Sequence, residues 1–127
     1  AILSVPCCQH EINLQLEKNK AAVASSSPFA SLERWGIVRE RFAALATDVI
    51  RAELLEQSGY AVQLLEFIDM EHTPKNILLR AVRKRNSALQ NGDSLQKSKE
   101  RLSALTETLG TSQTLANLLA ERGIALL

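Results

Sequence analysis

Residues 60–84 read YAVQLLEFIDMEHTPKNILLRAVRK, and this stretch decides the fold. Two apolar runs rich in β-branched and long aliphatic residues flank a polar segment over residues 71–76. Because neither run alternates strictly between apolar and polar positions, both are typical of strands buried on two faces. Pro74 fixes one backbone angle and biases the residue before it toward an extended conformation. The stretch therefore predicts an antiparallel hairpin with strands over residues 60–68 and 77–82.

Upstream of the hairpin, the sequence predicts one strand and three helices. Residues 1–5 form a short apolar run, AILSV, which Pro6 ends because proline cannot continue a strand ladder. Helices are expected over about residues 11–24, 29–35 and 37–58, with Gly36 and Gly59 as helix stops. A strand, a helical crossover and a second strand predict a right-handed unit with parallel strands, to which the strand over residues 77–82 is added antiparallel.

In the longest predicted helix, apolar residues recur at steps of three and four, and charged residues occupy other faces. The apolar positions are Val38, Phe42, Leu45, Val49 and Ala52. The charged positions are Arg39, Glu40, Asp48, Arg51 and Glu56. Since a helix that connects two strands of one sheet lies across that sheet, we expect the apolar stripe to pack against it. No residue of this helix is expected to act in function.

Downstream of the hairpin, two further helices are expected. Residues 91–93 read Asn-Gly-Asp, a turn signal, and a helix is expected from there to a stop at Gly110. A shorter helix then ends at Gly123. The sequence therefore predicts an α/β domain over residues 1–85 and a helical extension over residues 86–127.

Length and composition set limits on the class of protein. A chain of 127 residues fits one domain with a core, and 46% hydrophobic and 23% charged residues are ordinary for a globular protein. The net charge of +1 implies no general attraction to nucleic acid or membranes. A local basic run is the exception, and it fits either a contact with RNA or the solvated end of a strand. It consists of Arg80, Arg83, Lys84 and Arg85.

The sequence shows no apolar run of the roughly 18 residues that a membrane span requires, and no signal peptide. We therefore expect no membrane partner and a location in the cytoplasm or an organelle interior. The only two cysteines, Cys7 and Cys8, are adjacent, and neighbouring cysteines rarely form a disulfide because its geometry strains the backbone. Because Ala1 lies inside an apolar run that reads as the middle of a strand, we expect an N-terminal portion to precede it.

The residues best suited to chemistry fall in two polar clusters, which contain both cysteines and both histidines of the chain. The first cluster is Cys7-Cys8-Gln9-His10-Glu11, and the second is Glu71-His72-Thr73-Pro74-Lys75-Asn76. In open α/β sheets, ligands bind just beyond the carboxyl ends of strands, which is where the first cluster lies. If the first and last strands are neighbours, the end of one meets the start of the other. Both clusters would then line one pocket.

Two interpretations of these clusters involve cysteine chemistry. A zinc site made from Cys7, Cys8, His10 and His72 would have suitable ligand types, but established spacings leave two or more residues between cysteine ligands. Adjacent cysteines on an extended backbone also point to opposite sides. The second interpretation is a cysteine nucleophile with His10 or His72 as its base. The sequence gives no sign of a lowered thiol pKa, and buried cysteines more often serve as small hydrophobic residues.

Two other interpretations need no cysteine chemistry. A binding pocket needs only a few correctly placed polar groups, which Gln9, His10 and Asn76 could supply as hydrogen-bonding groups and Lys75 as a charge. Alternatively, His72, Thr73 and Asn76 only satisfy backbone groups of the turn between the strands. The residues alone leave these interpretations open.

Three stretches together resemble the C-terminal half of a class I S-adenosylmethionine-dependent methyltransferase. They are VPCCQHE over residues 5–11, GIVRERFAALATDVIRAELLEQSGY over residues 36–60 and EFIDMEHTPKNILLRA over residues 66–81. The resemblance covers residues 1–85 and is closest to the methyltransferase-domain family with a Cys-Cys motif after a late strand. Transfer RNA 2′-O-methyltransferases with a Cys-Cys-His-His motif are similar at that position only.

The resemblance implies a Rossmann-like sheet of seven strands, in which the last strand is antiparallel and lies between the fifth and the sixth. Residues 1–5 would be the fifth strand, residues 60–68 the sixth and residues 77–82 the seventh. It also implies S-adenosylmethionine as the cofactor, a methyl acceptor bound by residues of the two clusters, and RNA as the leading acceptor class. The implied acceptor-binding residues are Cys7, Cys8, Gln9, His10, Glu71, His72, Lys75 and Asn76.

The chain departs from this family in one respect. Such enzymes bind the cofactor with a glycine-rich loop, but the five glycines here are scattered and no Gly-x-Gly occurs. No cofactor-binding residue can therefore be assigned, and we expect residues 1–127 alone to be inactive. An upstream half, or self-association, would then cover the open edge of the sheet. The alternative function is a noncatalytic α/β binding module, and a metal-stabilised domain is the third.

Overall fold

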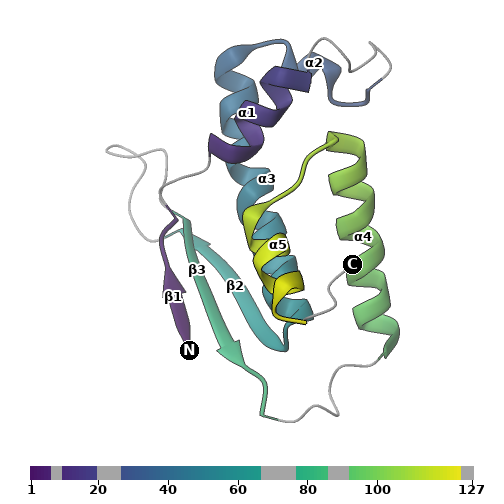
Figure 1. Cartoon of the computed structure of the whole chain (residues 1–127). Helices are drawn as coiled ribbons and strands as arrows, with labels where there is room; N and C mark the ends of the chain where they lie inside the picture. Colours follow the sequence, from purple (N-terminus) through teal and green to yellow (C-terminus); the bar gives the residue numbers. More distant parts are fainter. Residues whose placement is uncertain (7–9, 20–26, 67–76, 86–91, 124–127) are drawn as a thin grey trace.

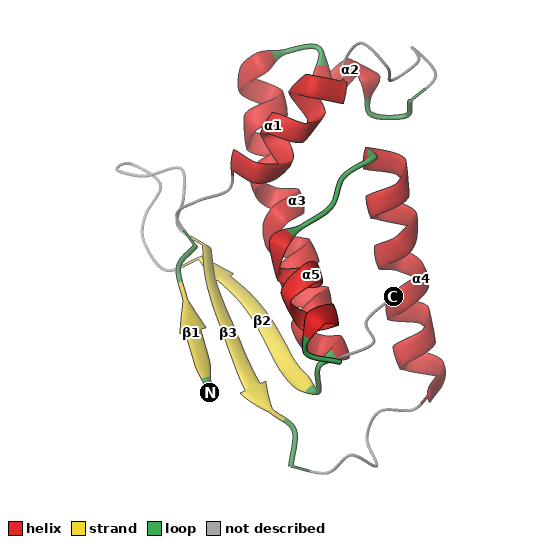
Figure 2. Ribbon diagram, in the orientation of Figure 1, coloured by secondary structure: helices red, strands yellow, loops and turns green. Residues whose placement is uncertain are grey.

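The computed structural model describes residues 1–6, 10–19, 27–66, 77–85 and 92–123. In this part of the chain, three strands form one sheet and five helices pack beside it (Figures 1 and 2). The elements are β1 (Ile2–Ser4), α1 (His10–Asn19), α2 (Ala30–Glu33), α3 (Gly36–Gln57), β2 (Tyr60–Glu66), β3 (Ile77–Arg83), α4 (Gly92–Leu109) and α5 (Thr114–Glu121). The α/β class expected from the sequence is therefore confirmed.

The sheet has the strand order β1-β3-β2, and β3 pairs antiparallel with both neighbours. Consequently β1 and β2 run in the same direction without pairing with each other. Ser4 lies opposite Leu79 on one side of β3, and Glu66 lies opposite Ile77 on the other. The antiparallel return of the last strand and its position beside the first strand are both as expected. Residues 67 and 68, which were expected to extend β2, lie outside the described residues.

Only one face of the sheet is covered by the described residues. Directly opposed residues in antiparallel strands share a face. Leu79 and Ala81 are buried on the face that meets the helices, whereas Leu3 and Leu65 on the other face are exposed. The expectation of strands buried on both faces is therefore wrong for this part of the chain. The physical reason is that the apolar runs place apolar side chains on both faces, but the described helices lie against one (Figure 2).

Helix α3 turns a different face to the interior than the sequence suggested. Its buried apolar residues are Ala43, Ala46, Ile50 and Leu54, which join Ile12 and Leu16 of α1 and Leu102 and Leu109 of α4 in the core. Val38, Leu45 and Val49 are exposed, so the expectation that their stripe packs against the sheet is wrong. Small residues at two buried positions let neighbouring helices approach closely, which favours this face for packing.

Two charged residues of α3 that were expected on outward faces are also buried, namely Arg39 and Asp48. Buried charges require partners. The Arg39 guanidinium donates to Asn13 Oδ1 at 3.2 Å, to the Glu33 carbonyl at 3.3 Å and to Glu17 Oε1 at 3.3 Å. Asp48 Oδ1 accepts from Arg51 at 3.2 Å. Arg39 therefore fastens α1 and α2 to α3 through polar contacts.

Glycines end helices at three of the four positions where the sequence predicted a helix stop. Gly59 and Gly110 have φ of 90° and 59°, and Gly123 has φ of 74°, all in the left-handed region. Gly36 is instead the first residue of α3, and α2 ends at Glu33, so the stop expected at Gly36 is wrong. Within the described ranges, no helix combines the length and the apolar character needed to cross a membrane.

Candidate functional site

One end of the sheet brings together the described residues that flank both polar clusters. Strand β1 ends at Ser4, two residues before Pro6, and β2 ends at Glu66, opposite Ile77 at the start of β3. Since Ser4 lies opposite Leu79, the end of β1 and the start of β3 are level. The start of α1 lies near this same end of the sheet (Figure 1). The topology that places the two clusters at one sheet end is therefore present.

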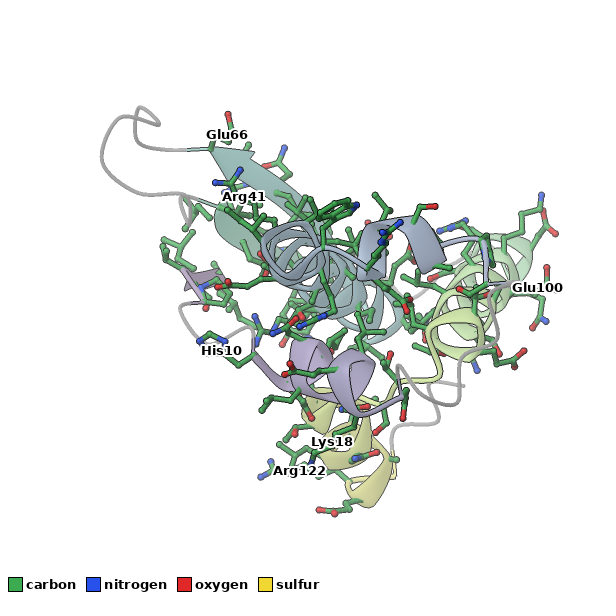
Figure 3. The ribbon with its side chains drawn as sticks, turned by 90° about the horizontal axis from the view of Figure 1, so that it is seen from above. His10, Lys18, Arg41, Glu66, Glu100 and Arg122 are labelled. Carbon is green, nitrogen blue, oxygen red and sulfur yellow. The ribbon has the colours of Figure 1, made fainter. Side chains whose placement is uncertain are left out.

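Of the eight residues expected to bind the methyl acceptor, the structure describes His10. It is the first residue of α1 and is exposed. In Figure 3, His10 lies with Arg41 of α3 and Glu66 of β2 on the side of the molecule that carries the sheet. The other seven expected residues lie outside the described residues, so their placement stays a prediction. They are Cys7, Cys8, Gln9, Glu71, His72, Lys75 and Asn76.

Helix α1, which begins at His10, is anchored on two sides. Ile12 and Leu16 are buried in the core cluster with α3 and α4. On another face, Gln15 forms two hydrogen bonds with the backbone of Ser112: its Nε2 donates to the carbonyl at 2.8 Å, and its Oε1 accepts from the amide at 2.8 Å. Because both anchors fix the helix axis, the start of α1 is a firm support for His10.

Glu11, the last residue of the first cluster, has a structural role in this arrangement. Its Oε1 accepts hydrogen bonds from the Thr114 amide at 2.9 Å and from the Thr114 hydroxyl at 2.7 Å. Gln113, the N-cap residue of α5, provides no side-chain cap of its own. Glu11 therefore caps α5 from a distant part of the sequence. This carboxylate is engaged and is not a candidate for chemistry at the sheet end.

The metal hypothesis is not tested by the structure, because Cys7, Cys8 and His72 lie outside the described residues. Among residues 1–6, 10–19, 27–66, 77–85 and 92–123, no three histidine, cysteine, aspartate or glutamate side chains are grouped closely enough to hold an ion. The cysteine-nucleophile hypothesis depends on the same residues and likewise stays a prediction.

A separate network of polar side chains, which the sequence did not indicate, lies between α3 and α4. Gln57 Nε2 donates to Ser98 Oγ at 3.1 Å, and Ser98 Oγ donates to Glu53 Oε2. The Arg101 guanidinium contacts both oxygens of Glu53 at 3.2 Å. Residues 53 and 57 lie on α3 and residues 98 and 101 on α4, so the two helices are bonded through side chains. No local pattern indicates this network, because the residues that bond across the two helices are more than forty positions apart in the sequence.

A small, partly open hollow of about 50 Å³ lies beside the same contact. Pockets for cofactors and drug-sized ligands are typically about 300–1,000 Å³, whereas about 10–15 Å³ of such space is enough for one water molecule. The hollow is therefore of a size for solvent and not for S-adenosylmethionine. It is lined by Glu56, Gln57, Lys84, Ser94, Leu95, Ser98 and Arg101.

Comparison with known proteins gives no relative: no protein-family model, curated protein or solved structure matches the chain. The class defined by the observations is an α/β protein with a three-stranded antiparallel sheet.

Proposed function

We propose that the chain is the acceptor-side part of an S-adenosylmethionine-dependent methyltransferase, with β1, β2 and β3 as the fifth, sixth and seventh strands of a Rossmann-like sheet. The strand order carries this proposal. The resemblance implies that the last strand lies antiparallel between the two before it, and the described sheet has the order β1-β3-β2 with β3 antiparallel to both. Hairpin-connected strands do not require this order, because β3 could equally have paired with β2 alone.

The second support is the convergence at one sheet end. Pro6 precedes the first cluster, whose member His10 begins α1, and Glu66 and Ile77 lie on either side of the second. β1, β2 and β3 bring these residues to the same end of the sheet. Ligands of open α/β sheets bind at this kind of position. In the proposed enzyme, His10 would contribute a polar contact to the acceptor from the first turn of α1. Such contacts serve positioning, which is the main source of catalysis when the leaving group is already activated.

Neither the glycine pattern of the sequence nor the described hollow fits the cofactor. The sequence has no Gly-x-Gly, and the hollow beside α4 is too small for a nucleoside. S-adenosylmethionine would therefore have to be held by residues outside this chain, and we derive no step of the reaction that passes through it. Residues 1–127 alone are expected to be inactive.

The proposal of RNA as the acceptor class rests on the resemblance, and the basic run over residues 80–85 adds little support to it. Arg80 lies opposite Gln63 and donates to its Oε1 at 2.9 Å, whereas Arg83 lies opposite Tyr60. Positions 80 and 83 are an odd number of residues apart in β3, so these two side chains lie on opposite faces of the sheet. A nucleic-acid footprint usually gathers its cations on one face. The run is therefore not a single basic patch.

The test is calorimetric titration of S-adenosylmethionine into residues 1–127 and into the full-length gene product. Saturable binding by the full-length product, with none by residues 1–127, would support the proposal. Absence of binding by both would overturn it and favour the noncatalytic α/β binding module, which the missing glycine-rich loop already suggests. Binding by residues 1–127 would contradict the assignment of this part to the acceptor side.

A variant then separates acceptor positioning from cofactor binding. In the full-length product, His10→Ala should lower methyl transfer at least about tenfold, a common loss for a positioning contact, while the affinity for S-adenosylmethionine stays within about twofold. Lys18→Ala, at the other end of α1, is the matched control because it changes an exposed residue of the same helix (Figure 3). Equal transfer rates in the two variants would remove His10 from the site.

A further inference from the structure

Strand β2 is an edge strand that lacks the features by which proteins usually protect such edges. In the described part of the sheet, β3 pairs with one side of β2 and no second strand lies on the other side. Natural edge strands are commonly very short, bulged, or marked by lysine or proline. The sequence of β2, YAVQLLE, contains neither lysine nor proline, and its seven residues pair with β3 in unbroken register, without a bulge. The free side of β2 is therefore suited to accept another strand.

The other edge strand of the sheet, β1, is protected by its shortness. It has three residues, and Pro6 follows two positions after its end. β2 is more than twice as long, and its last four residues, 63–66, are all exposed. Leu64 and Leu65 among them are 40% and 41% exposed. In Figure 3, Glu66 at the end of β2 lies on the side of the molecule away from α1 and α5. β2 is therefore the edge at which association is expected.

The hydrogen bonds of the sheet show which backbone groups of β2 point away from β3. The Lys84 amide donates to the Gly59 carbonyl at 3.0 Å, and these two residues continue the register of β2 and β3 by one position. Along an antiparallel ladder, directly opposed residues alternate between hydrogen-bonded and non-hydrogen-bonded pairs. The odd-numbered residues of β2 therefore bond to β3. The amides and carbonyls of residues 60, 62, 64 and 66 point to the free side.

We propose that the free side of β2 pairs antiparallel with the same side of β2 in a second copy of this chain, with Gln63 opposite Gln63 of that copy. In this register residue 60 meets residue 66 and residue 62 meets residue 64, each twice. Every outward amide and carbonyl of both strands is then bonded, whereas a register shifted by two residues leaves some of them unbonded. The product is one continuous sheet with a twofold axis perpendicular to it.

The side chains agree with this register. On the face that the helices cover, Val62 lies opposite Leu64 of the second copy, and on the open face Ala61 lies opposite Leu65. The two leucines that are exposed in a single copy are therefore each placed against an apolar neighbour, as stable cross-strand pairs require. Gln63 keeps the hydrogen bond that its Oε1 accepts from its own chain.

Charge at the ends of β2 selects the antiparallel direction and a second copy as the occupant. Arg83 of β3 lies opposite Tyr60, and in the proposed register Glu66 of the second copy lies on the other side of Tyr60. With strands about 4.8 Å apart, the Cα atoms of the arginine and this glutamate are about 10 Å apart, within the joint reach of their side chains. Both side chains are exposed, and neither forms an ion pair with another described residue. A parallel pair would instead place Glu66 beside Glu66.

The first test is sedimentation equilibrium of residues 1–127 over a wide concentration range. Leu64→Lys introduces a charge at the paired edge, opposite Val62 of the second copy, and should raise the dimer dissociation constant at least about tenfold. Leu118→Lys is the matched control: Leu118 is 49% exposed on α5, outside the sheet, so the constant should stay unchanged. Glu66→Arg and Arg83→Glu should each weaken the dimer severalfold, and the combined variant should recover most of the loss. Circular dichroism confirms that each variant is folded.

Cross-linking tests the register. In a background with Cys7→Ser and Cys8→Ser, Gln63→Cys should form a disulfide between two copies under mild oxidation. The reason is that directly opposed, non-hydrogen-bonded residues have Cα atoms about 4.5 Å apart, within the range that a disulfide spans. Ala61→Cys is the control, because positions 61 of the two copies are four residues out of register and about 14 Å apart, too far for a disulfide.

Three outcomes would overturn the proposal. One is a wild-type chain that stays monomeric at about 0.1 mM, because a dimer of micromolar affinity is almost fully formed at that concentration. Another is equal cross-linking by thiols at positions 61 and 63. The third is a dimer that survives Leu64→Lys, and its loss in Leu3→Lys would show that association uses β1.

Discussion

Removal of the Glu11 carboxylate should loosen the last helix of the chain, although the two are about a hundred residues apart in sequence. Glu11 Oε1 accepts two hydrogen bonds from the first residue of α5, one from the Thr114 amide and one from its hydroxyl, and Gln113 supplies no cap. A helix of eight residues is marginal without its tertiary contacts. Glu11→Ala is therefore a test of whether α5 depends on α1.

The magnitude follows from two contributions. Loss of a capping side chain costs about 1 kcal/mol, and loss of an acidic residue from the first turn of α1 costs about 0.5 kcal/mol. Together they predict a decrease in the free energy of unfolding of about 1.5 kcal/mol for Glu11→Ala. Glu11→Gln keeps an oxygen acceptor for Thr114 and loses only the charge, so it should cost about 0.5 kcal/mol.

The assay is urea denaturation followed by circular dichroism, with all variants at one protein concentration. With an m-value of about 1.5 kcal/mol/M, the midpoint for Glu11→Ala should fall by about 1 M. Hydrogen exchange should show lower protection at Thr114 and along α5 and unchanged protection in β3. Glu40→Ala, at an exposed position of α3, should stay within about 0.5 kcal/mol of the wild type. If Glu11→Gln is as destabilising as Glu11→Ala, the reasoning about the cap is refuted.

Three further predictions concern stability and can be checked by the same denaturation assay. Leu54→Ala should lower the free energy of unfolding by about 3 kcal/mol because Leu54 is fully buried. Leu45→Ala should lower it by less than about 1 kcal/mol at concentrations where the chain is monomeric. Equal losses would mean that the wrong face of α3 has been placed inside. Arg39→Met should cost about 3 kcal/mol through three lost hydrogen bonds that join α1, α2 and α3, and a neutral result would show that these contacts contribute nothing. Gly110→Ala should lower the free energy of unfolding by about 1–2 kcal/mol because φ at this position is +59°, which strains an L-amino acid. The added Cβ would lie 3.6 Å from Asn19 Nδ2, an ordinary contact, so the cost comes from the backbone alone. A stabilised variant would contradict this.

The sheet was predictable because its signals are local and strong. The apolar runs on either side of residues 71–76 predicted the antiparallel pair that β2 and β3 form, and the proline after the first apolar run predicted the end of β1. Burial of the second face was not predictable in the same way. An apolar run shows that both faces can be buried, and only the arrangement of other elements decides whether they are.

The buried face of α3 could not be read from the sequence, because the helix carries two apolar stripes. The stripe with larger residues, Leu45 and Val49 among them, is the more conspicuous one, but the core uses the stripe with Ala43 and Ala46. The presence of Arg39 on the buried side hid it further. Its burial depends on partners from α1 and α2, and tertiary hydrogen bonds of this kind leave no periodic signal.

For the candidate site, the sequence predicted that both polar clusters adjoin one end of the sheet, and their described flanks lie there. The supports of the site were not predictable. Gln15 and Glu11 bond to residues that follow them by 97 and 103 positions, so no local rule connects them. The roles of the residues outside the described ranges remain predictions.

The position of β3 in the centre of the sheet has a consequence for synthesis of the chain. As the chain emerges from the ribosome, β1 and β2 appear first, but neither pairs with the other in the finished sheet. Among the described residues, every strand–strand hydrogen bond therefore waits until residues 77–83 have emerged, and until then β1 and β2 have no partner in this sheet. A nascent chain stalled before residue 77 should consequently be the form most in need of a chaperone, and one released after residue 85 should need it much less.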